Sequence, residues 1–175
     1  MELSQRLYTA VLTFFITVIL SALMCYFIPR LILSSDFHLF TLERNIFLLV
    51  GLVPIILGLI TLIGFIWGFI LAGTGTPMPY DMPEELIVRG SYRFVRNPMY
   101  VGYYLLLLGQ AILFKSFGFL LYGAVLFLLF HLLVVFVEER MLKQQFGEVC
   151  EQYCKPVPRW IPRLRAFRGN ISKPS

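Results

Sequence analysis

The sequence has few charged side chains, and four long stretches have none. Charged residues make up 14% of the 175 residues, apolar residues make up 58%, and the mean hydropathy is +0.78. This apolar content exceeds what a soluble core needs, which excludes an ordinary soluble domain. The stretches without Lys, Arg, Asp or Glu are residues 7–29, 45–80, 97–114 and 116–137. Each reaches or nearly reaches the roughly 20 residues that a helix needs to cross a bilayer.

Cysteine is also scarce. Cys25, Cys150 and Cys154 have no further Cys or His close by in the sequence, so we expect neither a zinc site nor a structural disulfide. The sequence has no internal repeat and no low-complexity linker. The first apolar stretch is too long for a signal-peptide core and lacks a small-residue cleavage site, so it is predicted to be a retained helix.

The basic residues predict how the chain is oriented. If the N-terminus is cytoplasmic, twelve Lys and Arg residues lie in cytoplasmic segments and three lie outside, as the positive-inside rule requires. Both termini and the central loop are then cytoplasmic, in a bacterial inner membrane or the endoplasmic reticulum. The net charge of +5 flanks apolar spans and is not interleaved with aromatics in a soluble domain, so nucleic acid is not an expected partner.

The apolar stretches predict an all-α, polytopic membrane protein with about four transmembrane helices. Pro29 is expected to end the first helix, and Lys115 and Ser116 to form the turn of a C-terminal helical hairpin. The next segment has apolar residues at helical spacing, which favours an interfacial amphipathic helix on the bilayer or on the hairpin ends. The five predicted helices cover residues 7–28, 46–71, 98–114, 117–137 and 138–154.

Small residues follow one another at four-residue spacing in the second predicted helix. Gly64, Gly68 and Ala72 would let another element approach closely, either within the chain or in a homo-oligomer. We treat the chain as one structural domain, with N-terminal transmembrane helices in residues 1–72 and the motif-bearing region in residues 73–175.

Polar motifs gather where the hairpin opens. Asn97-Pro98 in GSYRFVRNPMYVG (residues 90–102) is typical of a helix start, in which Asn accepts from the first free amides. Glu138 and Glu139 close the hairpin beside Arg96. Because adjacent helical residues point about 100° apart, only one carboxylate should face a shared site. A structural salt bridge, positive-inside anchoring and an aromatic belt are the alternatives.

A glycine pair precedes this segment. Gly73 and Gly75 would let backbone approach a ligand closely, although a helix-capping turn is the simpler interpretation. No strand pattern precedes them, which argues against a dinucleotide-binding fold.

Three motifs in this order resemble the integral-membrane methyltransferases. They are GTGTPMP (residues 73–79), GSYRFVRNPMYVG and EERMLKQQFGEVCEQY (residues 138–153), and the resemblance covers residues 73–162. That superfamily includes isoprenylcysteine carboxyl methyltransferases and phospholipid N-methyltransferases. The carboxyl branch usually has His where Asn97 stands, whereas NPMYVG looks closer to the phospholipid branch.

The resemblance implies S-adenosylmethionine as the cofactor. The positions implied to bind it are Gly73, Gly75, Tyr92, Arg93, Arg96, Pro98, Tyr100, Gly102, Glu138 and Glu139. The catalytic candidates are Arg96, Asn97, Tyr100 and Glu138. The chemistry is compatible, since a methyl sulfonium with an amino-acid end needs a carboxylate, a cation and an aromatic face.

Three further residues are candidates for contact with the substrate. His131 lies inside the fourth predicted helix, where ionisable residues are functional hypotheses, although a neutral His bonded to Gln110 on another helix is the alternative. Tyr153 and Arg159 are candidates for contact with donor or headgroup, or are interface anchors.

The sequence thus predicts methyl transfer from S-adenosylmethionine to a membrane lipid or lipidated acceptor at the cytoplasmic interface. A phospholipid amine is favoured over an isoprenylcysteine carboxylate. The alternative from another class is a small transporter or a non-catalytic membrane subunit. A proton-coupled transporter would keep an acid in mid-membrane, whereas every Asp and Glu here lies at or beyond the end of a span.

Overall fold

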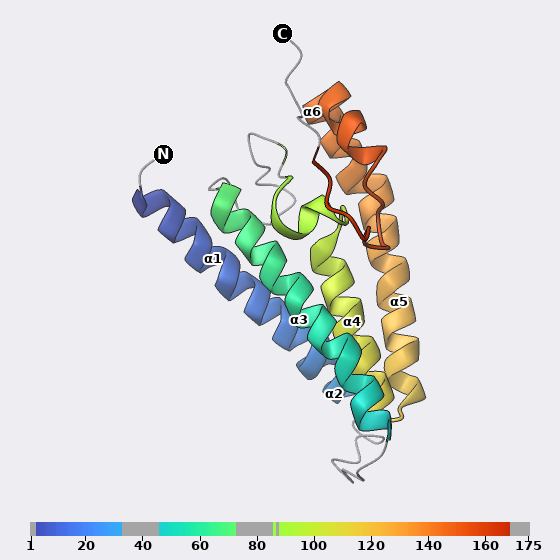
Figure 1. The fold of residues 1–175 in the computed structure, drawn as a ribbon. Coiled ribbons are helices and arrows are strands. Elements are labelled where there is room, and N and C mark those ends of the chain that lie inside the picture. Colours follow the sequence, from blue (N-terminus) through green and yellow to red (C-terminus); the bar gives the residue numbers. More distant parts are fainter. Residues whose placement is uncertain (1–2, 33–45, 73–85, 87, 169–175) are drawn as a thin grey trace.

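The computed structural model describes residues 3–32, 46–72, 86 and 88–168, in which the regular elements are all helical (Figure 1). The α-helices are α1 (Leu3–Ala22), α2 (Ile28–Ile32), α3 (Ile46–Ala72), α4 (Pro98–Leu113), α5 (Phe117–Leu133) and α6 (Glu139–Cys154). Two π-helical segments, Leu23–Phe27 and Val134–Glu138, and a 3₁₀ turn, Gly90–Arg93, complete the described elements.

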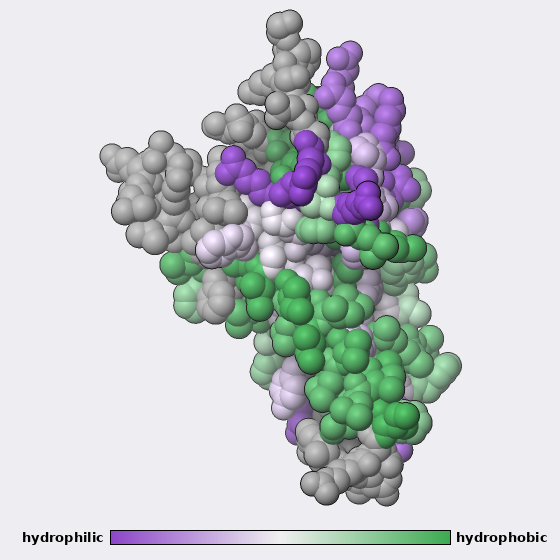
Figure 2. All heavy atoms as spheres, viewed as in Figure 1, coloured by the Kyte–Doolittle hydropathy of each residue, from purple (hydrophilic) through white to green (hydrophobic). Residues whose placement is uncertain are grey.

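The helices have the length and surface of membrane spans. Ile46–Gly68 and Phe117–Cys154 are long and apolar enough to cross a bilayer, and Phe15–Leu31 and Pro98–Leu113 are shorter apolar helices. Large apolar side chains are exposed along α3 and α5, and Figure 2 shows a broad hydrophobic surface below a hydrophilic end. Such a surface belongs in lipid. The prediction of an all-α polytopic membrane protein is confirmed.

Pro29 does not end the first helix, contrary to the prediction. The helix continues through the π-helical segment Leu23–Phe27 into α2, and Pro29 is buried. Proline has no N–H and clashes with the carbonyl four residues earlier, so it normally breaks a helix. Here the N–H of Ile28 bonds to the carbonyl of Leu23, five residues back. This π-helical turn is wider than an α-helical turn and lies directly before the proline, where the chain continues into α2.

Glycines allow α3 and α4 to pack closely as antiparallel neighbours. A Cβ on Gly58 would lie 2.9 Å from the carbonyl oxygen of Gly102, and one on Gly102 would lie 2.6 Å from Cγ of Leu62. Neither position has room for a larger side chain. This contact fixes the first turns of α4, and therefore the candidate site, against the middle of α3.

The small-residue face of Gly64 and Gly68 is occupied by the same chain. A Cβ on Gly68 would lie 3.0 Å from the carbonyl oxygen of Arg89, and the Ser91 hydroxyl donates to the Thr61 carbonyl over 3.1 Å. Gly90 has φ +56°, which favours glycine. The close approach is therefore intramolecular, which is one of the two alternatives that the sequence left open, and the homo-oligomer stays a prediction.

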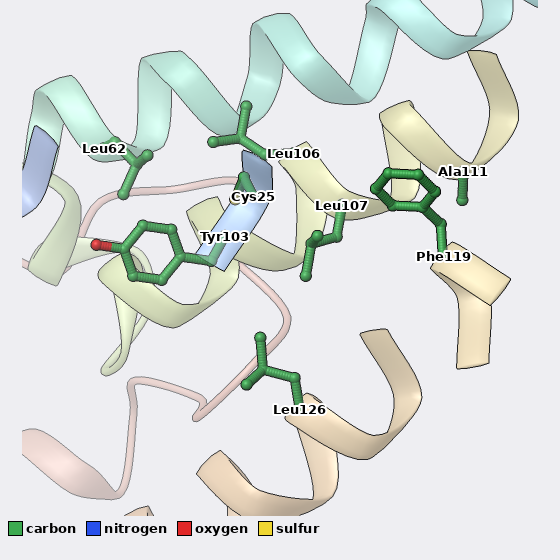
Figure 3. Packing of buried hydrophobic residues seen from close by; sticks show 8 residues of the cluster. All are labelled: Cys25, Leu62, Tyr103, Leu106, Leu107, Ala111, Phe119 and Leu126. Atoms are coloured by element: carbon green, nitrogen blue, oxygen red, sulfur yellow. The ribbon is translucent and has the colours of Figure 1, made fainter. Parts of the chain in front are cut away.

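The hairpin forms as predicted. Lys115 adopts φ 50° in the turn between α4 and α5, and its Nζ lies 4.7 Å from the centre of the Phe47 ring at the start of α3. Figure 3 shows the buried cluster that holds the spans together. Its members are Cys25, Leu62, Tyr103, Leu106, Leu107, Ala111, Phe119 and Leu126.

Helix α6 continues α5 through the π-helical segment Val134–Glu138, so the predicted amphipathic helix begins at the end of the hairpin. Gly147, with φ 48° and ψ −122°, bends α6 in its middle. The described starts of α1 and α4, the end of α3, and α6 all lie at one end of the molecule (Figure 1). This arrangement gathers the polar motifs at one end of the spans.

Candidate active site

Three segments converge where α4 begins and α5 passes into α6. They are residues 90–97, the α5–α6 junction, and residues 155–168, which we call the tail. The N–H groups of Arg96, Arg163 and Phe167 donate to the carbonyls of Pro158, Phe94 and Arg93 over 2.9, 2.9 and 2.8 Å. This pairing could not be predicted from the sequence, because backbone donors and acceptors leave no signal in the residue types.

Glu139 is held by two arginines. Its Oε1 accepts from Nη1 of Arg96 at 3.0 Å, and both of its oxygens accept from Arg159, at 2.5 and 2.8 Å. The Glu139 and Arg96 side chains are 12% and 16% exposed, and that of Arg159 is 41% exposed. Burial acts to raise the pKa of Glu139, but the hydrogen bonds and charges of the two arginines lower it overall. Glu139 is thus an ionised carboxylate whose bonding capacity is used within the protein.

Glu138 has different surroundings. Its Oε1 accepts a hydrogen bond from the Tyr100 hydroxyl, and its other oxygen accepts none from the described residues. Burial and, secondarily, the nearby charge of Glu139 raise the pKa of Glu138, although the Tyr100 bond opposes the rise. The two adjacent carboxylates therefore have different partners, and the prediction that only one of them faces a shared site stays a prediction. Glu138 retains an oxygen with which to bind a ligand.

Arg96 also retains a free donor. Its Nη1 binds Glu139, while its buried Nε has no hydrogen-bond partner among the described residues. A buried donor of this kind is costly to leave unpaired, which makes it a natural contact for an anionic ligand group.

The Asn97-Pro98 step differs partly from its prediction. Pro98 is the first residue of α4, as expected, but the Asn97 side chain makes no cap hydrogen bond. Its Nδ2 donates instead to the carbonyl of Arg159 over 3.3 Å. The capping prediction is therefore wrong. The Asn97 side chain bonds to the tail, and the residues around Asn97 in the sequence do not predict that contact.

Aromatic rings surround Trp160 beside the carboxylates. Trp160 Nε1 donates to Nδ1 of His131 over 3.2 Å, and its ring centre lies 6.5 Å from that of Tyr100. Gln110, the expected partner of His131, donates within its own helix to the carbonyl of Leu106. That pairing was predicted wrongly, since Trp160 comes from a tail whose fold was not foreseen.

The remaining predicted residues lie around this centre or away from it. Tyr153 is buried and donates to the carbonyl of Tyr92 over 2.7 Å, while Nε of Arg93 donates to that of Phe167 over 2.9 Å. Gly102 faces Leu62 in the α3–α4 contact. Gly73 and Gly75 lie outside the described residues. The structure brings together Arg96, Asn97, Tyr100, Glu138, Glu139 and Arg159, with His131 adjoining through Trp160.

The residues present fit the cofactor that the motifs imply. An S-adenosylmethionine zwitterion needs an anion for its positive centres and a donor for its carboxylate. Glu138 offers an unpaired carboxylate oxygen and Arg96 a buried unpaired N–H, while the buried ring of Tyr100 packs against Phe130 and its hydroxyl donates to Glu138. Glu139, by contrast, already accepts three hydrogen bonds from Arg96 and Arg159.

An all-helical membrane protein with its polar site at the mouth of a C-terminal hairpin is the class that fold and site define. The model of the phospholipid methyltransferase family matches residues 46–149, and the chain belongs to that family. The match spans α3 to α6 and includes both carboxylates.

Two curated relatives resemble part of the chain. Protein-S-isoprenylcysteine O-methyltransferase of Schizosaccharomyces pombe is 40% identical over 80 residues, which are 45% of this chain and 34% of the relative. Cobalt-zinc-cadmium resistance protein CzcN of Cupriavidus metallidurans is 33% identical over 86 residues, 49% of this chain and 39% of the relative. The matches thus span little more than a third of either relative. No solved structure matches the chain.

Proposed function

We propose that this protein transfers a methyl group from S-adenosylmethionine to a lipid-like acceptor at the cytoplasmic face of the membrane, with a phospholipid amine as the favoured acceptor. The observation that carries the proposal is the position of Glu138. A carboxylate with one unpaired oxygen stands at the end of an apolar hairpin, where a water-soluble donor and a membrane-bound acceptor can meet. Family membership supports an enzyme over the transporter alternative.

Two side chains would hold the donor. Bound S-adenosylmethionine supplies a methyl group on a positively charged sulfur. Glu138 would bind a positive centre, and a carboxylate about 4 Å from a unit charge contributes about 4 kcal/mol at an effective dielectric of 20, before desolvation. Arg96 would donate through Nε to the carboxylate end. Tyr100, hydrogen-bonded to Glu138, fixes the direction of the unpaired oxygen.

Glu138 also suits an amine acceptor. A protonated amine has no lone pair for attack, so the acceptor must lose a proton before methyl transfer. Burial raises the pKa of Glu138, which makes it a better base than an exposed carboxylate. Holding the amine and the donor close together contributes to the rate as well, because proximity and alignment remove much of the entropic cost.

An isoprenylcysteine carboxylate is the second candidate acceptor. The 40% identity to the isoprenylcysteine methyltransferase supports it. A carboxylate acceptor needs no base, and its own charge would approach that of Glu138. This repulsion, together with Asn97 in place of the His of the carboxyl branch, is why we favour the amine.

The cytoplasmic placement rests on charge. Arg93, Arg96 and Arg159 belong to the segments that form the site, whereas α2, which contains Arg30, and the turn between α4 and α5, which contains Lys115, lie at the opposite end (Figure 1). The positive-inside rule would then place the site in the cytoplasm.

The test uses the full chain in lipid nanodiscs with methyl-labelled S-adenosylmethionine and a total lipid extract. We expect label in a base-stable, amine-containing lipid, and little label with Glu138→Gln. Glu151→Gln, an exposed carboxylate on α6, is the matched control. If label appears only in a base-labile ester, the acceptor is a carboxylate and not an amine. Unchanged calorimetric affinity for the donor in both Glu138→Gln and Arg96→Ala would refute the assigned site.

A further inference from the structure

The tail returns to the depth of the apolar belt after α6 ends. The Trp160 ring centre lies 5.2 Å from that of Phe127 and 5.9 Å from that of His131, both on α5. From Phe117, roughly 20 helical residues cross the hydrocarbon, so the apolar core ends near Val137. Phe127 and His131 lie about 15 and 9 Å before that limit along the helix. Trp160 therefore sits below the boundary between lipid and water.

Two large apolar side chains next to Trp160 point outward. Ile161 is 79% exposed and Leu164 is 101% exposed. The α5 surface beside Trp160 is also apolar and exposed, at Leu128, Leu132 and neighbouring positions. Ile161 and Leu164 of the tail therefore continue the lipid-facing surface of α5. Figure 2 shows hydrophobic atoms reaching up to the hydrophilic end.

The same segment is strongly basic. Arg163, Arg165 and Arg168 alternate with the apolar residues, and the sequence has no Asp or Glu after Glu151. Arg165 and Arg168 are exposed, and one buried Nη of Arg163 has no hydrogen-bond partner among the described residues. Arginine donors at the level of the headgroups complement phosphate.

We infer that residues 160–168 form a membrane-surface segment whose partner is the anionic phospholipid bilayer. Ile161 and Leu164 enter the boundary of the acyl chains, and the exposed Arg165 and Arg168 bind lipid phosphates. The N–H groups of this segment also donate to the carbonyls of Arg93 and Phe94. Lipid contact therefore stabilises the closed tail, in which these hydrogen bonds hold residues 155–168 against the site. The inference does not depend on methyl transfer.

Spin labels in proteoliposomes test the location. Cys25 and Cys150 are buried, so Cys154→Ser provides a background without a reactive surface thiol. In this background, Leu164→Cys carries the probe, and Glu151→Cys on the exposed side of α6 carries the control label. We expect the label at 164 to collide more with oxygen than with a water-soluble nickel chelate, and the label at 151 to do the reverse. Equal nickel access at both positions would overturn the inference.

Vesicle composition tests the anionic partner. Adding phosphatidylglycerol to phosphatidylcholine vesicles should shift the label at 164 further from the chelate, and each of Arg165→Gln and Arg168→Gln should reduce the lipid-bound population about fivefold. No response to phosphatidylglycerol would contradict the phosphate contacts. Trp160 provides an independent measurement that needs no label. With Trp67→Phe, its fluorescence should be quenched by bromolipids, and unquenched emission would contradict the inferred depth.

Discussion

Replacing Glu139 by Gln tests whether charge holds the tail over the site. Glu139 accepts three hydrogen bonds from Arg96 and Arg159. A hydrogen bond to a charged group contributes about 1.5–3 kcal/mol, and a neutral one about 0.5–1.5 kcal/mol. The two bonds from Arg159 attach the tail directly, and solvent weakens them because the Arg159 side chain is partly exposed. The shielded bond between Glu139 and Arg96 holds the segment to which the tail is hydrogen-bonded. We expect Glu139→Gln to weaken tail closure by about 2 kcal/mol.

Amide hydrogen exchange measures this loss directly. The N–H groups of Arg163 and Phe167 donate to carbonyls of residues 93 and 94, so they exchange when the tail opens. A change of about 2 kcal/mol corresponds to about 30-fold more open state, and hence about 30-fold faster exchange at both amides. Glu151→Gln removes a carboxylate from the exposed face of α6 and should leave the exchange unchanged.

The contribution of Glu139 to tail closure should depend on pH. The pKa of Glu139 in the folded protein lies below its ordinary value of 4.5, so its contribution is complete above that value and is lost as pH falls through the lowered pKa. Wild-type exchange at the two amides should therefore accelerate relative to its intrinsic rate only in acid. If Glu139→Gln leaves the exchange of both amides unchanged at neutral pH, the backbone bonds and Trp160 hold the tail without the ion pairs.

Two further predictions concern the base and the helix packing. The rate of methyl transfer should rise with pH as Glu138 ionises through its raised pKa, and Glu138→Gln should abolish this rise. Tyr100→Phe should move the rise to higher pH, because it removes a hydrogen bond to the ionised form of Glu138. A pH–rate profile on amine lipid checks all three outcomes. Gly102→Ala should lower the melting temperature in detergent by the equivalent of about 1–3 kcal/mol, since its Cβ meets Leu62, whereas Gly123→Ala, with open space around it, should be neutral or stabilising.

The spans could be predicted because charge is excluded from hydrocarbon. Residues 46–71 and the hairpin appear in the structure almost as predicted, since uninterrupted apolar runs have few other solutions. Pro29 misled the prediction, because a local rule about proline takes no account of a preceding π-helical turn. The face of Gly64 and Gly68 was correctly predicted to be a close contact, but the sequence does not say which segment fills it.

The site could be predicted only as a set of residue types. Arg96, Tyr100 and Glu138 are named by their motifs and lie together in the structure. The partners of Glu139, Asn97 and His131 depend on the tail, which approaches largely through backbone hydrogen bonds. Such bonds are open to any sequence, so no spacing of side chains announces them.

The π-helical segment Val134–Glu138 decides which carboxylate meets Tyr100. A π-helical turn holds one residue more than an α-helical turn, so it turns every later residue back by about 100° relative to an unbroken helix. Without it, Glu138 would point where Glu139 now points, toward Arg96 and Arg159, and Val137 would face Tyr100. The division of labour between an ion-paired Glu139 and an available Glu138 therefore depends on backbone geometry as much as on the two side chains.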